Sequence, residues 1–307
     1  MEIYMRCNRA VQIVSFAFFL LLVSALVAAQ APKHDKAFWR GIAEHHYDVP
    51  NGESASALAH GLSSLLASPD PELRDDLGYS ILARWIGRPN ILQPDDLRTL
   101  ADEWAANLKD GIGESGTNSV LKRSFSALCL SLLAEREAKI PFLGASRYHQ
   151  LVADAITYLQ AERDLRGYDA KLGWIHATAH TSDLLQALAA SPMLTPDEES
   201  AILKAVEIRL ASAPDVYRQG EQDRIAQAVL AVVRRADFAT DSFEIWLTRM
   251  QAADKQVWEE PLTPESLARY QNHTYTLQAL AVRMELESDS TKIAALRQRV
   301  LGILRSR

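Results

Sequence analysis

Hydrophobic residues recur at intervals of three and four along most of the chain after residue 30. In ELRDDLGYSILARWI, Leu73, Leu77, Ile81 and Trp85 fall on one side of a helix, and VLKRSFSALCLSLLAE, AILKAVEIRL, RIAQAVLAVV and FEIWLTRM repeat this spacing. Such a period is that of an amphipathic α-helix. No segment shows a convincing strand pattern, so the sequence predicts an all-α protein.

Proline and capping residues mark where several helices begin. Asp70 precedes Pro71 in SPDPEL, LTPDEE contains a capping-box pattern at Thr195, Pro196 and Glu198, and LTPESL starts another helix at Pro264. These signals predict antiparallel pairs of helices: 54–67 with 70–87, 94–109 with 118–137, 146–163 with 174–190, 196–212 with 222–235, and 240–255 with 264–284.

The predicted pairs recur at roughly 40–50 residues, which is the period of HEAT and armadillo repeats. No consensus of letters repeats with them, so the repetition is one of architecture. We therefore predict an α-solenoid of HEAT/armadillo-like antiparallel helix pairs. A compact multi-helix bundle is the alternative.

The first thirty residues have a different character from the rest. Arg6 and Arg9 precede the apolar run VQIVSFAFFLLLVSALV, and the small residues of AAQAPKHD follow it. This order predicts a secretory signal peptide over residues 1–29, cleaved after Ala29 to leave one all-helical domain over 30–307. The protein would then be periplasmic or secreted. The alternative is an uncleaved N-terminal helix that tethers it, since about 17 apolar residues is near the lower limit for a membrane span.

Composition and charge narrow the class of partner. The chain has 307 residues, 48% of them hydrophobic, and a net charge of −6, which becomes −7 when Glu2, Arg6 and Arg9 are removed. An acidic chain without a block of Lys and Arg is a poor candidate for binding nucleic acid or, after cleavage, a membrane. Cys129 is the one cysteine left after cleavage, so we expect no internal disulfide and a buried, inert thiol in its apolar helix.

The segment GWIHATAHTSDLL, residues 173–185, carries the most suggestive chemistry. On a helix over 174–190, His176, His180 and Asp183 would share one face at the border between apolar and polar sides. Two imidazoles four residues apart can bind Zn²⁺ or Fe²⁺, with the aspartate as a third ligand or a supporting group. The Ala-Thr-Ala spacer lacks the glutamate of H-E-x-x-H. Simple packing of both rings is the competing interpretation.

The polar loop before this segment, ERDLRGYDAKLG, adds candidate binding residues, because loops on rigid scaffolds often carry sites. Together with two residues of GEQDR, the candidates are Glu162, Asp164, Arg166, Tyr168, Asp169, Trp174, Glu221 and Arg224. The glycines of DGIGESG spell G-x-G-x-x-G, but LADEWAANLK before them reads as a helix, so we predict an interhelical loop instead of a dinucleotide site.

Several of these segments resemble a bacterial family, domain-of-unknown-function family 2785 (DUF2785). The similar segments are RDDLGYSILARWI, RSFSALCLSLLAE, ERDLRGYDAKLGWIHATAHTSDLLQALA and the shorter GEQDRIAQAVL, which together span about residues 70–235. The resemblance implies an all-helical, HEAT-like protein. It implies no activity and no catalytic residue.

Two functions are consistent with these features. The first is an exported helical-repeat protein that binds a peptide, a protein or a small polar ligand in a groove lined by residues 162–183, because solenoids present extended binding surfaces. The alternative is a metal-dependent hydrolase centred on His176, His180 and Asp183. Convergence of Glu162, Asp164 or Glu221 on both imidazoles would favour the enzyme.

Overall fold

The computed structural model describes residues 34–287 and 290–306. The chain divides into two units, Met1–Asp35 and Lys36–Arg307, and all of the helices described below belong to the second unit. The signal peptide predicted for residues 1–29 lies outside the described residues and stays a prediction. Across the described ranges, no helix has the length and apolarity that a membrane span requires.

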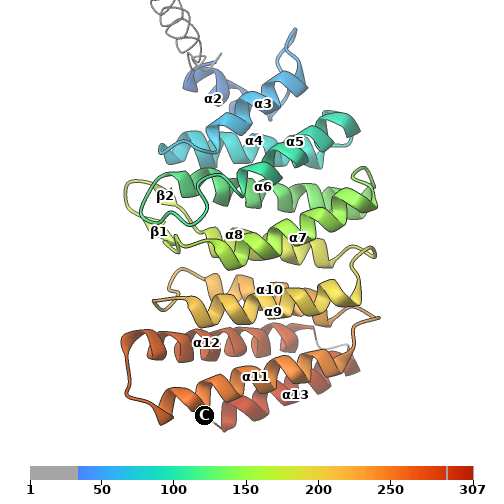
Figure 1. The fold of residues 1–307 in the computed structure, drawn as a ribbon. Helices are drawn as coiled ribbons and strands as arrows, with labels where there is room; N and C mark the ends of the chain where they lie inside the picture. Colours follow the sequence, from blue (N-terminus) through green and yellow to red (C-terminus); the bar gives the residue numbers. More distant parts are fainter. Residues whose placement is uncertain (1–33, 288–289, 307) are drawn as a thin grey trace, which may run out of the picture. The chain divides into compact units, whose positions relative to one another are not determined.

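The described part of the chain is all-α, as predicted, apart from one very short hairpin (Figure 1). The hairpin strands are β1 (Tyr168–Asp169) and β2 (Gly173–Trp174). The helices are α2 (Lys36–Glu44), α3 (Ala55–Leu65), η1 (Glu72–Tyr79), α4 (Ser80–Gly87), α5 (Pro94–Asn107), α6 (Ser119–Lys139), α7 (Ala145–Ala161), α8 (Ala177–Ala189), α9 (Pro196–Ser212), α10 (Glu221–Val233), α11 (Thr240–Glu259), α12 (Pro264–Leu286) and α13 (Thr291–Arg305).

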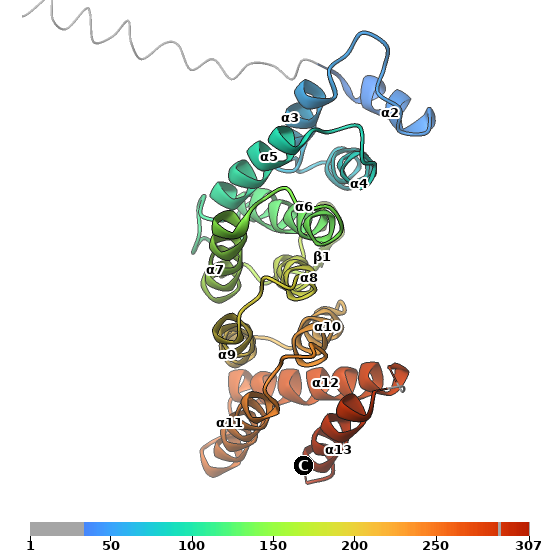
Figure 2. The ribbon, with the colours of Figure 1, turned by 90° about the vertical axis from the view of Figure 1, so that its right-hand side faces the viewer.

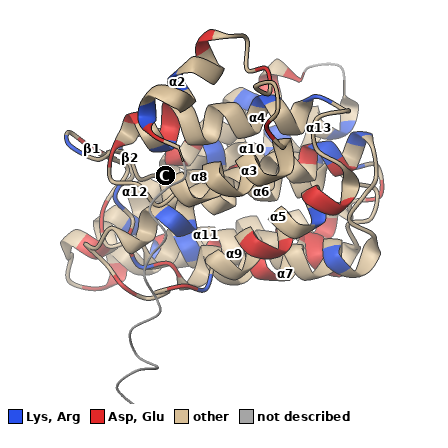
Figure 3. Cartoon of the chain, turned by 90° about the horizontal axis from the view of Figure 1, so that it is seen from above, with Lys and Arg blue, Asp and Glu red and all other residues tan. Residues whose placement is uncertain are grey.

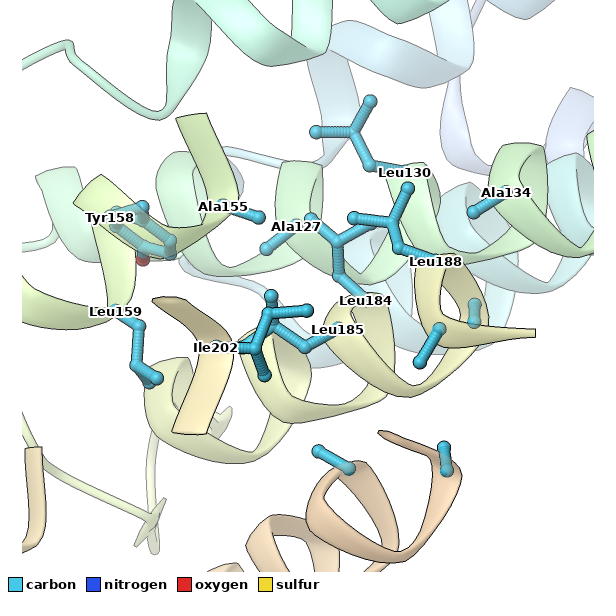
Figure 4. Close-up of a cluster of buried hydrophobic side chains, with 14 of the residues drawn as sticks. Ala127, Leu130, Ala134, Ala155, Tyr158, Leu159, Leu184, Leu185, Leu188 and Ile202 are labelled. Carbon is cyan, nitrogen blue, oxygen red and sulfur yellow. The ribbon is translucent and has the colours of Figure 1, made fainter. Parts of the chain in front are cut away.

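Helices in the middle of the second unit pack in two rows. Helix α8 contacts α6 on one side and α10 on the other, while α7 contacts α9 in the second row (Figure 2). Apolar side chains from both rows meet between them; Leu130 and Leu188 come from one row, and Tyr158 and Ile202 from the other (Figure 4). The strongest packing of α8 is therefore with the helices beside it in its own row.

The predicted helix starts at Pro196 and Pro264 are confirmed. Thr195 Oγ1 accepts a hydrogen bond from Glu198 N at 3.3 Å, and the Glu198 carboxylate accepts one from Thr195 N at 2.9 Å, which completes the capping box. At α12, Thr263 Oγ1 accepts from Ser266 N at 3.1 Å. Capping of this kind satisfies backbone N–H groups that the first helical turn leaves without partners.

The helix predicted over 70–87 is confirmed in extent, but its first half is a π-helix instead of an α-helix. Residues 72–79 form the π-helix η1, which continues directly into α4. Ser80 Oγ donates to Asp75 O at 3.1 Å, five residues back, and a Cβ on Gly78 would lie only 3.0 Å from Leu73 O. A hydroxyl donor and a glycine accommodate the wider turn, which a period of 3.6 residues cannot reveal.

The helix predicted over 174–190 begins three residues later, and the expectation of no strand is wrong here. Tyr168 pairs with Trp174 and Asp169 with Gly173 in an antiparallel hairpin, and α8 starts at Ala177. His176 is the N-cap, with φ 52° in the left-handed region. Two-residue strands are too short to produce a visible alternation of apolar and polar residues.

Two smaller predictions are confirmed. The three glycines of DGIGESG lie in the loop between α5 and α6, all with positive φ, and no strand precedes them within residues 34–110. Cys129 is fully buried in α6, and burial raises the pKa of its thiol. The glycine motif is therefore an interhelical loop, and Cys129 is a buried core residue.

Candidate functional site

A cleft of about 500 Å³ opens between η1, α6, α8 and α10. Its polar lining includes Tyr79 from η1, Glu135 from α6 and Gln186 from α8. It also includes three predicted site residues, His180, Asp183 and Arg224. Pockets of this size hold small molecules when a few polar groups converge in them, so this cleft is the leading candidate site.

Asp183 is paired with an arginine and not with the histidines. Arg224 Nη1 of α10 lies 2.7 and 2.8 Å from the two carboxylate oxygens of Asp183 on α8. Burial raises the pKa of Asp183 above its usual value, and the hydrogen bond from the guanidinium opposes that rise. The pair ties α8 to α10 across the cleft and occupies both oxygens of the predicted third metal ligand.

His180 lies at the back of the cleft, with only 7% of its surface exposed. Its Nδ1 is 2.8 Å from Ser124 Oγ, and that hydroxyl is also bonded to Ile175 O. The Phe125 ring meets the imidazole edge to face at 4.9 Å between centroids. Burial lowers the pKa of His180 well below its usual range, so the ring is neutral at neutral pH.

His176 is next to His180 but is not part of the cleft lining, and it contacts different groups. Its ring stacks on Trp174 at 4.7 Å and meets His180 edge to face at 5.7 Å. Its Nε2 is 3.4 Å from Glu221 Oε1 at the start of α10. Burial acts to raise the pKa of Glu221, but hydrogen bonds from His176 and from backbone N–H groups outweigh it and leave that pKa below its usual value.

The hairpin that carries Trp174 is held in place by Arg74 of the π-helix. The Arg74 guanidinium is fully buried and donates to Leu172 O at 2.6 Å, to Trp174 O at 3.0 Å and to Ser68 O at 2.9 Å. It also lies over the Phe125 ring at 4.7 Å. Arg74 therefore fixes the backbone that leads into His176 and α8.

The acidic residues of the loop before the hairpin are structural. Glu162, which is 3% exposed, accepts from Arg123 Nε at 2.7 Å and from Nη2 at 3.1 Å. Asp164 accepts from Arg166 at 2.7 Å and from Gly116 N at 2.9 Å. These bonds join the loop to α6 and to the glycine loop. Asp164, Arg166 and Glu221 also line a smaller cavity of about 250 Å³.

Tyr168 and Asp169 belong to the hairpin itself. Tyr168 is 54% exposed, and its ring meets Trp174 edge to face at 5.1 Å. The Asp169 carboxylate accepts from Lys171 N at 2.8 Å and from Leu172 N at 2.9 Å, and these backbone bonds lower the pKa of Asp169. Asp169 thus closes the turn, while Tyr168 presents an aromatic ring to solvent.

The predicted residues therefore do not gather in one groove over 162–183. Of the three carboxylates considered as partners of both imidazoles, Glu221 reaches His176, while Glu162 and Asp164 are paired with Arg123 and Arg166. Within residues 34–287 and 290–306, no group of three or more His, Cys, Asp or Glu is placed to hold a metal ion. The metal-dependent hydrolase stays a prediction.

Sequence reasoning missed several residues of the cleft. Tyr79 lines the cleft from the last position of η1, and burial raises the pKa of its phenol to about 12. Glu135 and Gln186 look like ordinary surface residues of amphipathic helices, and Ser124 looks like part of the core. Their role depends on which helices face one another across the cleft, and periodicity does not give that information.

Comparison with known proteins identifies a family. The model of a family described as a protein of unknown function (DUF2785) matches residues 108–282, which is more than half of the 307-residue chain. The matched region contains the histidine segment, α6, α8 and α10. No curated protein matches, and no solved structure matches. The chain belongs to this family, which confirms the family resemblance, although the segment RDDLGYSILARWI lies outside the matched residues.

Proposed function

We propose that this DUF2785 protein binds a small polar ligand in the cleft between η1, α6, α8 and α10. The observation that carries the proposal is the convergence of Tyr79, Glu135, His180 and Gln186 on one cavity of about 500 Å³. These side chains come from three different elements, so the fold and not local sequence brings them together. A cavity of a few hundred Å³ with a small number of convergent polar groups is typical of small-molecule sites.

The unpaired side chains of Glu135 and Gln186 support ligand binding in the cleft. Among the described residues, the side chains of Glu135 and Gln186 make no hydrogen bond or ion pair with another side chain. Gln186 is half-buried and Glu135 is exposed, so both side chains are free to bond a ligand, and the half-buried amide gains most from a ligand that completes its hydrogen bonds. Leu128 and Leu132 supply apolar lining beside them, which would shield those bonds from water.

The arrangement of helices is the second support. We infer that the antiparallel pairs form an α-solenoid of the HEAT/armadillo kind, because α6, α8 and α10 follow one another in one row and α7 and α9 in the other. Solenoids bind ligands on the surface that one row presents. The cleft lies on the row that contains α6, α8 and α10.

A ligand screen with a blocking variant tests the proposal. Thermal unfolding of the full chain would be followed with a library of amines, amino acids, dipeptides, sugars and carboxylates. A ligand at 100 times its Kd adds about 2.7 kcal/mol of stability, which raises Tm by about 5 °C in a domain of this size. Affinity for each stabilising compound would then be measured by calorimetry.

The variant Gln186→Trp places a large ring in the cleft, and Gln298→Trp on the exposed side of α13 is its matched control. We expect Gln186→Trp to weaken binding at least tenfold and Gln298→Trp to leave it within about twofold. Equal binding by both variants would show that the ligand sits elsewhere. Stoichiometric metal in the purified protein, lost in a His176→Ala/His180→Ala variant, would favour the hydrolase instead.

A further inference from the structure

We propose that the cleft selects a ligand carrying a protonated amine on a short aliphatic chain. This inference rests on the proposed function, because it takes the cleft as the binding site. It follows from three observations: His180 presents a hydrogen-bond acceptor, Glu135 carries a charge without a partner among the described residues, and the two arginines of the lining are each paired with a carboxylate.

The proton on the imidazole of His180 is placed by Ser124. The Ser124 hydroxyl has one hydrogen, and it donates that hydrogen to Ile175 O. Ser124 Oγ can therefore only accept from His180 Nδ1, 2.8 Å away. The neutral ring carries its proton on Nδ1, which leaves the lone pair on Nε2. The backbone carbonyl of Ile175 thus fixes His180 as an acceptor for whatever enters the cleft.

Both arginines of the cleft are already paired with carboxylates. Arg224 donates to both oxygens of Asp183, and Arg234 Nη1 lies 3.3 Å from Glu287 Oε1. Each guanidinium thus has a carboxylate partner inside the protein. A carboxylate ligand would therefore meet no unpaired cation in the cleft, and its charge would lie near those of Asp183 and Glu135.

Glu135 is the acidic group of the cleft without a partner among the described residues. This carboxylate lines the cleft from α6 and, among the described residues, has no ion pair or hydrogen bond. The Glu135 side chain is exposed, so a ligand that enters the cleft can reach its carboxylate. Because Arg224 and Arg234 are both paired, Glu135 is the charged group of the lining that has no partner among the described residues. A cationic ligand would form an ion pair with it.

An alkylammonium matches these groups. It has hydrogens to donate to His180 Nε2, to the Glu135 carboxylate and to the Tyr79 phenol oxygen, and its charge complements Glu135. Its methylene chain would lie against Leu128 and Leu132. A neutral hydroxyl offers one donor and no charge, and a carboxylate offers none.

The tautomer can be tested without any ligand. Long-range ¹H–¹⁵N NMR spectra of the full chain with ¹⁵N-labelled histidine distinguish a proton on Nδ1 from one on Nε2, and His180→Gln identifies the signals. We expect His180 to be neutral with the proton on Nδ1, and Ser124→Ala to populate the other tautomer. A proton on Nε2 in the wild type would overturn the inference.

The ligand class is tested with three probes of similar length: 1,5-diaminopentane, its N,N′-diacetyl derivative and glutarate. We expect the diamine to bind at least tenfold more tightly than the other two and to shift the His180 Nε2 signal. Glu135→Gln should weaken diamine binding about tenfold, whereas the matched variant Glu259→Gln, at an exposed position near the end of α11, should not change it.

The outcomes separate the two proposals. If glutarate or the diacetyl compound binds more tightly than the diamine, and Gln186→Trp weakens that binding, the cleft remains the binding site but the preference for an amine is overturned. Failure of the diamine to bind overturns the amine preference as well. If, in addition, no compound in the wider library binds in a way that Gln186→Trp weakens, the proposed function fails with it.

Discussion

Three buried arginines position the loops around the site. Arg74 holds the hairpin, Arg123 binds Glu162 before it, and Arg209 donates to the Glu162 carbonyl at 2.9 Å. All three side chains are almost completely buried. A buried guanidinium is unfavourable unless its donors are satisfied, and the planar fork of donors suits several backbone carbonyls at once. These residues therefore define where the histidine segment lies.

Replacing Arg74 by methionine should destabilise the protein strongly. The substitution preserves much of the side-chain volume but leaves the carbonyls of Ser68, Leu172 and Trp174 without their donor and Asp75 without its cation. We expect a loss of about 3–5 kcal/mol in the free energy of unfolding, measured by urea denaturation. Arg147→Met, which breaks an exposed pair with Asp102, should cost less than about 1 kcal/mol.

Asp75 should make stability depend on pH. Burial raises the pKa of Asp75 from 3.8 to about 6, although Arg74 Nε lies 2.7 Å from its Oδ1. The folded state then binds a proton that the unfolded state releases between about pH 4 and pH 6, so the free energy of unfolding falls as pH rises through that window. The decrease attributable to this group is up to about 3 kcal/mol.

Urea denaturation at pH 4, 5, 6 and 7 measures this dependence. The decrease from pH 4 to pH 6 should be smaller in Asp75→Asn than in the wild type, while Asp76→Asn, at the exposed neighbouring position, should keep the wild-type slope. Identical slopes in all three proteins would rule out Asp75 as the titrating group.

At the scale of elements, the π-helix and the hairpin act together. The start of η1 lies against the second strand of the hairpin at Gly173. A Cβ added to Gly173 would lie 2.8 Å from Pro71 Cβ and 3.3 Å from Arg74 Nη2, so there is no room for a side chain there. Gly173 also has φ 71°, which favours glycine. One residue therefore provides both the turn of the backbone and the space for the neighbouring element.

Alanine substitutions separate these two contributions. Gly113→Ala introduces a Cβ at φ 91° in open space, so it should cost about 1 kcal/mol from backbone strain alone. Gly173→Ala adds the overlap with Pro71 and should cost about 3 kcal/mol. Thermal and urea unfolding of both variants would measure the difference, and equal losses would mean that the hairpin moves freely away from η1.

The elements differ in how far the sequence predicts them. Capped amphipathic helices such as α9 and α12 are predictable because their signals are local: Pro196 and Pro264 each follow a threonine cap. The hairpin and η1 are not, because neither a left-handed His176 nor a widened turn has a signature in the 3.6-residue period of apolar positions. Both errors occur beside the site, where tertiary contacts override local preference.

At the scale of the molecule, the candidate site exists only through the packing of the helices. The sequence identifies His180, Asp183 and Arg224 as site residues, and all three line the cleft. It does not reveal that Arg224 binds Asp183, because the two residues are 41 positions apart on different helices. Charged residues of both signs are distributed over many helices (Figure 3), so overall charge does not point to the cleft either.

Export would be a property of the whole molecule. If residues 1–29 are a signal peptide, the mature protein begins at Gln30 and is found outside the cytoplasm. Cell fractionation followed by intact-mass measurement of the full-length gene product would test it. A mass that includes residues 1–29 in the membrane fraction would indicate the tethered alternative, and the same mass in the cytoplasm would contradict export.

Binding in the cleft can be located by hydrogen–deuterium exchange of the full chain, with and without the compound that gives the largest rise in Tm in the library screen. We expect slower exchange in peptides covering 128–135, 180–190 and 224–234, because these segments line the cleft. Unchanged exchange there, with protection confined to another part of the chain, would contradict the cleft as the binding site.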